Sequence, residues 1–165
     1  MSVRRGTDLT CPSAQTGMSD VQVLGIVTGS PERPRVAYMN GYVPATEEVL
    51  ADAHPLPATQ VLRLAAKCEE RRCAHFDGHL CQLATRIVRM LDEVVDALPA
   101  CVIRKSCRWF EQEGRPACLR CPQIVTSVIG KDDGLAKLAR FADVADPEGR
   151  EGKNGSVEAD RVGRS

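Results

Sequence analysis

Cysteine spacing is the feature that most restricts how this chain can fold. Seven of its eight cysteines lie between Cys68 and Cys121, and the remaining one is Cys11. No secretory signal is expected at the N-terminus, so the compartment predicted for the chain is the reducing cytoplasm. Clustered cysteines there bind metal or do redox work more often than they form lasting disulfides. The spacing therefore predicts a metal-binding protein rather than a disulfide framework.

The last four cysteines form a complete set of metal ligands, called here the C-terminal set. Its members are Cys101, Cys107, Cys118 and Cys121. Thiolates are soft ligands, and both zinc and iron-sulfur clusters are usually held by four of them or by three and a nitrogen. The ending Cys118-x2-Cys121-Pro122 resembles part of the bacterial ferredoxin motif, and that resemblance is limited to these five residues. We expect the C-terminal set to bind one metal centre.

The first three clustered cysteines form an N-terminal set that lacks a fourth thiol. They are Cys68, Cys73 and Cys81. His75 and His79 lie among them, and one of the two, with His75 the chosen candidate, could complete a second site; both could instead be ordinary turn residues. The set could also hold a cluster with one open iron, or supply spare thiols beside a single centre. Cys11 is interpreted as a free thiol in a mobile leader.

The intervals between ligands favour iron-sulfur clusters over zinc. Structural zinc modules typically join two Cys-x2-4-Cys pairs by a spacer, whereas this chain has one x2 pair and one x4 pair among longer intervals. Such intervals suit a cluster held by helices and loops. We expect one or two 4Fe-4S clusters, with zinc as the alternative.

Charge and hydropathy exclude several classes of partner. Twenty-two basic and 22 acidic residues cancel, so the chain as a whole has no field that would attract nucleic acid. No run of residues is long and apolar enough to span a membrane. Basic residues around the C-terminal set could stabilise an anionic centre or dock a redox partner protein, and Trp109-Phe110 is expected to shield the metal from water.

The predicted fold class is α+β, with a small N-terminal β-hairpin layer and a cysteine-rich, mainly helical metal-binding region. We expect a flexible leader over 1–20, a single domain over 21–145 with its cysteine-rich core at 68–122, and a disordered tail over 146–165.

The hairpin is predicted between Val21 and Tyr42, and Thr46 is predicted to cap a short helix over 47–52. Apolar residues at three- and four-residue steps predict a helix from Cys81 to Leu98 that would hold the two cysteine sets apart. A strand over 123–129 and a helix over 134–144 are predicted after the last cysteine.

These features predict an iron-sulfur protein that acts in electron transfer or redox sensing. A zinc-stabilised protein-interaction module is the alternative, and an enzyme using an open iron at the N-terminal set is a third possibility. No phosphate-binding loop or paired nucleophile and base is recognisable in the sequence, so an enzyme is not the expectation.

Overall fold

The fold is built on a curled four-stranded antiparallel sheet in the order β1-β4-β2-β3. The structure is a computed structural model, and it describes residues 8–126. The strands are β1 (Thr10–Cys11), β2 (Gln22–Ser30), β3 (Arg33–Tyr38) and β4 (Leu62–Lys67). Strands and helices occur together, which confirms the α+β class.

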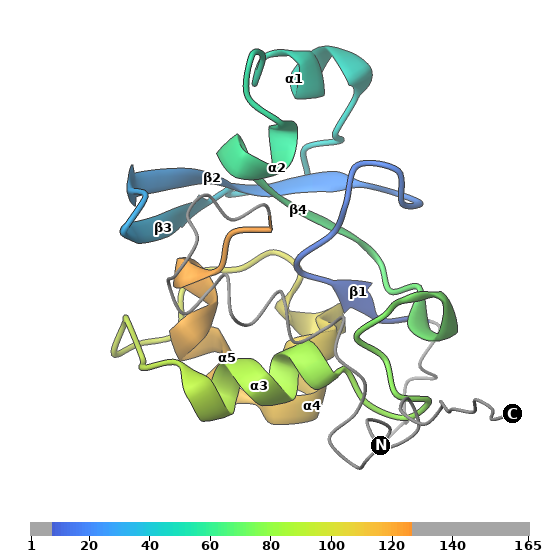
Figure 1. The fold of residues 1–165 in the computed structure, drawn as a ribbon, viewed down its shortest axis with the longest axis vertical. Helices are drawn as coiled ribbons and strands as arrows, with labels where there is room; N and C mark the ends of the chain where they lie inside the picture. The colour runs from blue at the N-terminus through green and yellow to red at the C-terminus, as the bar shows by residue number, and fades with distance from the viewer. Residues whose placement is uncertain (1–7, 127–165) are drawn as a thin grey trace, which may run out of the picture.

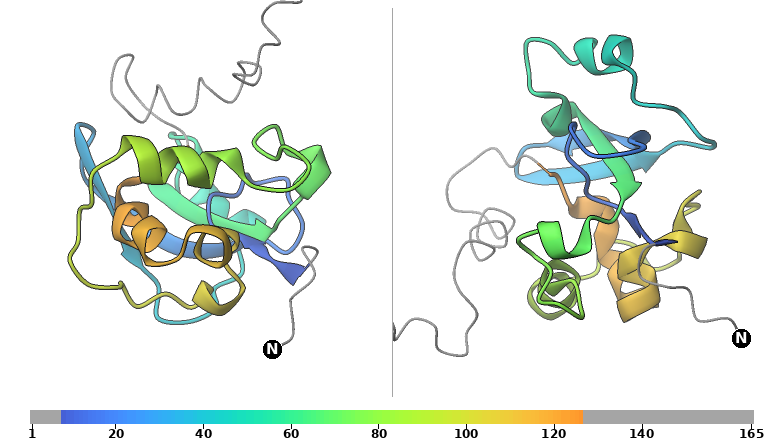
Figure 2. Two further views of the ribbon diagram at one scale, coloured as in Figure 1. Left: turned by 90° about the horizontal axis from the view of Figure 1, so that it is seen from below. Right: turned by 90° about the vertical axis from the view of Figure 1, so that its right-hand side faces the viewer.

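Helices lie on both sides of the sheet (Figure 1). Two short ones, α1 (Glu47–Ala51) and α2 (Ala58–Val61), lie on one side, and α3 (Gln82–Met90), α4 (Arg108–Glu113) and α5 (Arg115–Arg120) lie on the other. The 3-10 turns η2 (Glu70–Arg72) and η3 (Arg104–Ser106) precede α3 and α4, and η4 (Cys121–Gln123) follows α5. Figure 2 shows α3 beside α4 and α5, and α3 contacts both. The cysteine-rich half of the chain therefore forms one layer beneath the sheet.

Strand β4 divides the core between the two layers. Successive side chains of a strand point to opposite faces. Leu64 and Ala66 pack with Val23 on the face of α1, whereas Ala65 packs with residues of the helical layer on the other face. By this alternation Arg63 shares the face of Ala65, and it is 0% exposed. A charged side chain thus occupies a core position beneath the sheet.

The predicted hairpin and its following helix are confirmed. Strands β2 and β3 pair as far as Ser30 and Arg33, which leaves Pro31-Glu32 as the turn. Thr46 caps α1 by accepting a hydrogen bond from the Val49 amide at 3.2 Å. Strand β3 ends at Tyr38, and residues 43–45 then pair with β2 through isolated backbone contacts.

Residues 8–20, expected to belong to a flexible leader, pack against the sheet. Strand β1 pairs with β4, and the Ala14 amide donates to the Leu64 carbonyl at 3.0 Å. Ala14 is 0% exposed. A strand of two residues is too short to show an alternating pattern, so β1 could not be predicted from the sequence.

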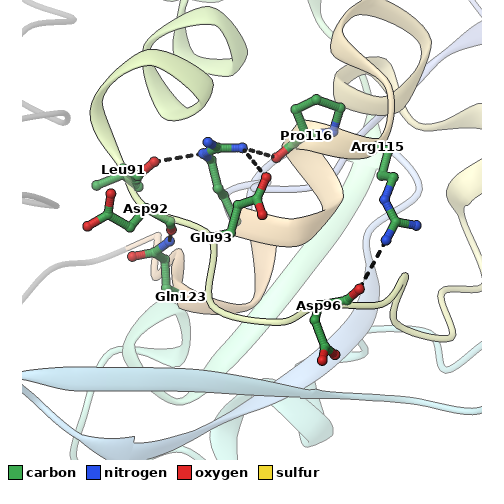
Figure 3. A network of polar contacts seen from close by, with 8 residues as sticks. Leu91, Asp92, Glu93, Asp96, Arg115, Pro116 and Gln123 are labelled. Carbon is green, nitrogen blue, oxygen red and sulfur yellow. Dashed lines mark hydrogen bonds and ion pairs between the residues drawn. The ribbon is translucent and has the colours of Figure 1, made fainter.

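The long helix predicted from Cys81 to Leu98 is wrong beyond Met90. Helix α3 ends there, and the next segment runs extended along α5 (Figure 3). Arg120 donates to the Leu91 carbonyl at 2.7 Å, and the Val94 amide donates to the Leu119 carbonyl at 2.9 Å. Tertiary hydrogen bonds therefore replace helical ones, and the segment does not hold the cysteine sets apart.

Three sequence predictions reach beyond the described residues. The helix over 134–144 and the tail over 146–165 lie outside them, as do residues 127–129 of the strand predicted over 123–129. The described part of that strand is wrong, because Gln123 ends η4 and residues 124–126 form no strand. Among the helices of residues 8–126, none has the length and apolar character needed to cross a membrane.

Candidate metal centre

The four thiols of the C-terminal set line one cavity beneath the sheet, called here the C-terminal site. Its volume is about 20 Å³, and it is bounded by Leu24 and Tyr38 of the sheet and by Trp109 and Ala117 of the helices. Cys101 precedes η3, Cys107 precedes α4, Cys118 lies within α5 and Cys121 follows it. The structure thus brings together the four residues that the sequence grouped.

Backbone amides surround these sulfurs. Cys107 stands at the start of α4, where the amides of Trp109 and Phe110 act to lower the pKa of its thiol, as the Ile103 amide does for Cys101. The first amides of a helix have no partner within it, so they are available to an anionic ligand. Burial nevertheless raises the pKa of Cys107 to about 12. A metal would have to displace the proton from this thiol.

Two guanidinium groups approach the C-terminal site. Arg104 lines the cavity and donates to Cys118. Arg63 donates to the Cys121 sulfur at 3.1 Å and lies over the Trp109 ring at 5.3 Å. Within residues 8–126 no carboxylate pairs with Arg63. A buried charge without a counter-charge is costly, and a metal held by four thiolates would supply that counter-charge.

The N-terminal set lines a second, larger cavity together with Cys11, which we had interpreted as a free thiol. The cavity has a volume of about 430 Å³, and its walls include all four thiols of what we call the N-terminal site: Cys11, Cys68, Cys73 and Cys81. Cys11 ends β1, Cys68 follows β4, Cys73 follows η2 and Cys81 precedes α3. Pairing of β1 with β4 brings the first two together, so Cys11 is the ligand candidate that sequence spacing missed.

The histidines take different positions around the N-terminal site. His75 lines the cavity, and its carbonyl accepts a hydrogen bond from the Gln82 amide at 2.7 Å. His79 is exposed in the loop whose turn is closed by Asp77. With Cys11 present, four thiols are available without an imidazole. His75 stays a possible ligand, and His79 lies away from the cavity.

Backbone amides and an ion pair also surround the N-terminal site. The amides of Leu83 and Ala84, at the start of α3, act to lower the pKa of the Cys81 thiol. Burial raises the pKa of Cys81 and raises that of Cys11 to about 12. Arg108 lines this cavity, but its charge is paired with Glu70 at 2.9 Å. The N-terminal site therefore has less uncompensated positive charge than the C-terminal site.

The two sites are neighbours with a common wall. Trp109 is 2% exposed and lines both cavities, so its ring lies between them. Pro12 lines the C-terminal site, whereas the preceding residue, Cys11, lines the N-terminal site. The expected role of Trp109 in shielding a metal extends to both sites.

The thiols surround these cavities without meeting at a point. All eight cysteines are in thiol form, with no disulfide in residues 8–126. Over the same residues, no three Cys, His, Asp or Glu side chains are arranged to hold a metal ion. The donors fit soft metals, and the 430 Å³ cavity has space for more than one ion. The cavity of the C-terminal site, at about 20 Å³, has a much smaller volume.

Four of the basic residues around the C-terminal set make contacts within the fold. Arg104 faces the cavity, Arg108 pairs with Glu70, and Arg115 and Arg120 hold the segment 91–96 against α5 (Figure 3). Their main contacts are within the fold.

Comparison with known proteins gives no relative for this chain. No family model matches it, and no curated protein or solved structure is significantly similar. The proposal below therefore rests on the geometry of the two sites.

Proposed function

We propose that the chain is an iron-sulfur protein that acts in electron transfer or redox sensing. The observation that carries this proposal is the N-terminal site, where four thiols from four separate segments surround a cavity of about 430 Å³. A 4Fe-4S cluster is commonly held by four cysteines. A single ion with four thiolates would leave most of such a cavity unfilled.

The surroundings of both sites favour thiolate-bound metal. The first amides of α3 and α4 act to lower the thiol pKa of Cys81 and Cys107, and such dipoles stabilise anionic clusters and tune their potentials. Trp109 would keep water from either centre. The thiols of the N-terminal site are half-buried, so a cluster there would lie near enough to the surface to exchange electrons with a docked redox protein.

Zinc is a second candidate, and the size of the C-terminal site favours it there. That cavity measures about 20 Å³, a space closer to one ion than to a cluster. A zinc ion at the C-terminal site would stabilise the helical layer, as in an interaction module. The third class, an enzyme with an open iron, loses its main argument because Cys11 supplies a fourth thiol at the N-terminal site.

Metal content after anaerobic purification tests the proposal. Brown protein absorbing near 400 nm, with iron and acid-labile sulfide, is the expected result. Colourless protein with stoichiometric zinc would favour the interaction module. Protein with neither metal, and no uptake of iron and sulfide under reducing conditions, would refute metal binding. The cytoplasmic location and the redox partner remain part of this proposal.

A further inference from the structure

Arg63 connects the chain segments that carry the two sites. Its Nε donates to the Pro12 carbonyl at 2.5 Å, and its Nη1 donates to the carbonyls of Cys121 and Ile124 at 3.0 and 2.9 Å. Its remaining nitrogen donates to the Cys121 sulfur. One buried side chain of β4 thus binds the backbone beside Cys11 and the backbone around Cys121.

A second contact joins the same two segments. The Ser13 hydroxyl lies 2.9 Å from the hydroxyl of Thr126. Thr126 lies two residues after Ile124, whose carbonyl accepts a hydrogen bond from Arg63. The two residues that follow Cys11, Pro12 and Ser13, are therefore both tied to the backbone after Cys121 or to the arginine that binds it.

The charge of Arg63 makes this connection sensitive to metal. A divalent ion or a cluster with four thiolates carries net negative charge, because the ligands bind as thiolates. Such a centre at the C-terminal site would attract the guanidinium, whose partners there are a sulfur and two carbonyls. Without it, the guanidinium is a buried cation without a counter-charge and is held less firmly.

We propose that Arg63 is a positioning residue that couples the two sites, so that metal at the C-terminal site holds Cys11 in place and increases metal affinity at the N-terminal site. This inference rests on the proposed metal binding and not on the identity of the metal. Because coupling between binding sites is reciprocal, metal at the N-terminal site must increase affinity at the C-terminal site by the same factor.

Titration of the reduced, metal-free full-length protein with Cd²⁺ tests the coupling. Cd²⁺ is a soft ion, and its binding to thiolates is followed by ultraviolet absorbance and calorimetry. Cys118→Ser reports the N-terminal site, and Cys11→Ser reports the C-terminal site. We define the coupling factor as the overall affinity of the native protein divided by the product of these two single-site affinities.

A coupling factor of about tenfold or more is expected for the native protein, and Arg63→Gln should return it to about one. For each Arg63 or Arg33 variant, the two single-site affinities are measured after Cys11→Ser or Cys118→Ser is added to that same variant. Arg63→Lys keeps the charge with fewer donors and should give an intermediate factor. Arg33→Gln, which removes an exposed arginine from β3, is the matched control and should leave the factor unchanged.

Two outcomes overturn the coupling: a native factor of one with both sites filled, or the same factor in Arg63→Gln as in the native protein. If Arg63→Gln does not fold, the native comparison and Arg63→Lys still decide the question. Failure of both single-site variants and the native protein to bind Cd²⁺ would instead refute the proposed function, and the coupling with it.

Discussion

The Cys68 amide donates a hydrogen bond to the Leu9 carbonyl at 2.9 Å, one step beyond the last residue pair of β1 and β4. The β1–β4 ladder thereby continues to the edge of the N-terminal site. Since Cys11 ends β1 and Cys68 follows β4, a backbone register fixes two ligand candidates relative to each other. The N-terminal site depends on a segment far from the other cysteines in sequence.

Cys11→Ser is expected to remove the centre at the N-terminal site and leave that at the C-terminal site. If both sites hold 4Fe-4S clusters, the variant should contain about half of the native iron and sulfide. Cys118→Ser should remove the other half. Iron, sulfide and zinc analysis of both purified variants measures this. Native metal content in Cys11→Ser would show that this thiol is not a ligand.

Alkaline pH should destabilise the metal-free protein through Cys107. Its thiol has an ordinary pKa of 9.0, and burial raises this to about 12 in the fold. Between these values the unfolded chain loses a proton that the folded chain keeps, so stability is retained below pH 9 and falls as pH rises toward 12. At pH 10 the loss from this thiol is about 1.4 kcal/mol.

Urea unfolding of the reduced, metal-free protein at pH 8 and pH 10 measures this effect. Cys107→Ala lacks the thiol and should lose about 1.4 kcal/mol less over the same interval. Other groups that titrate in this range contribute equally to both proteins. An identical decline in the two would show that Cys107 ionises as easily in the fold as in the unfolded chain.

Helix geometry and strand patterns predicted some of this fold well. The β2–β3 hairpin and the Thr46 cap follow from local signals, namely alternating apolar residues and a hydroxyl before two acids. The C-terminal set was likewise predictable, because its ligand candidates are close in sequence. The hairpin, the Thr46 cap and the C-terminal set each depend on residues that are close together in the sequence.

Long-range contacts were not predictable from local patterns. The apolar residues between Leu91 and Leu98 fit a helical period, but side chains and amides of α5 bind that backbone in an extended form. Cys11 lacks neighbouring cysteines, and only the pairing of β1 with β4 relates it to Cys68. In the sequence, Arg63 is a single charged residue in an apolar strand. Its buried position beneath the sheet could be predicted only once the register of that strand was known.

Arg120→Gln should loosen the extended segment against α5. The guanidinium donates to the carbonyls of Leu91 and Pro116 at 2.7 and 2.8 Å, and its loss should lower stability by about 1–2 kcal/mol. Hydrogen exchange at the Val94 amide, which donates to Leu119, should accelerate. Arg115→Gln, on an exposed residue with one bond to the Asp96 carbonyl, is the control and should change stability by less than about 0.5 kcal/mol. Equal effects of the two substitutions would contradict this account.

Metal removal should loosen the helical layer more than the hairpin. The amides of Trp109 and Phe110 lie in the first turn of α4 after Cys107, and they should exchange faster once the metal no longer fixes that sulfur. Amides in the β2–β3 ladder, such as those around Ile26 and Ala37, should keep more of their protection. Hydrogen exchange of metal-bound and metal-free protein compares the two regions. The same exchange pattern in both forms would mean that metal binds to an already rigid fold.

The pairing of β1 with β4 also determines when the two sites can form during synthesis of the chain. Cys11 leaves the ribosome well before Cys68, and Arg63 emerges 58 residues before Cys121, whose sulfur it contacts. The N-terminal site cannot assemble until Cys81 has emerged, and Arg63 can contact the Cys121 sulfur only after Cys121 has emerged. If the proposed centres form, the N-terminal site can therefore be filled before the C-terminal site, and until each is filled its early thiols are exposed to oxidants and to competing ions.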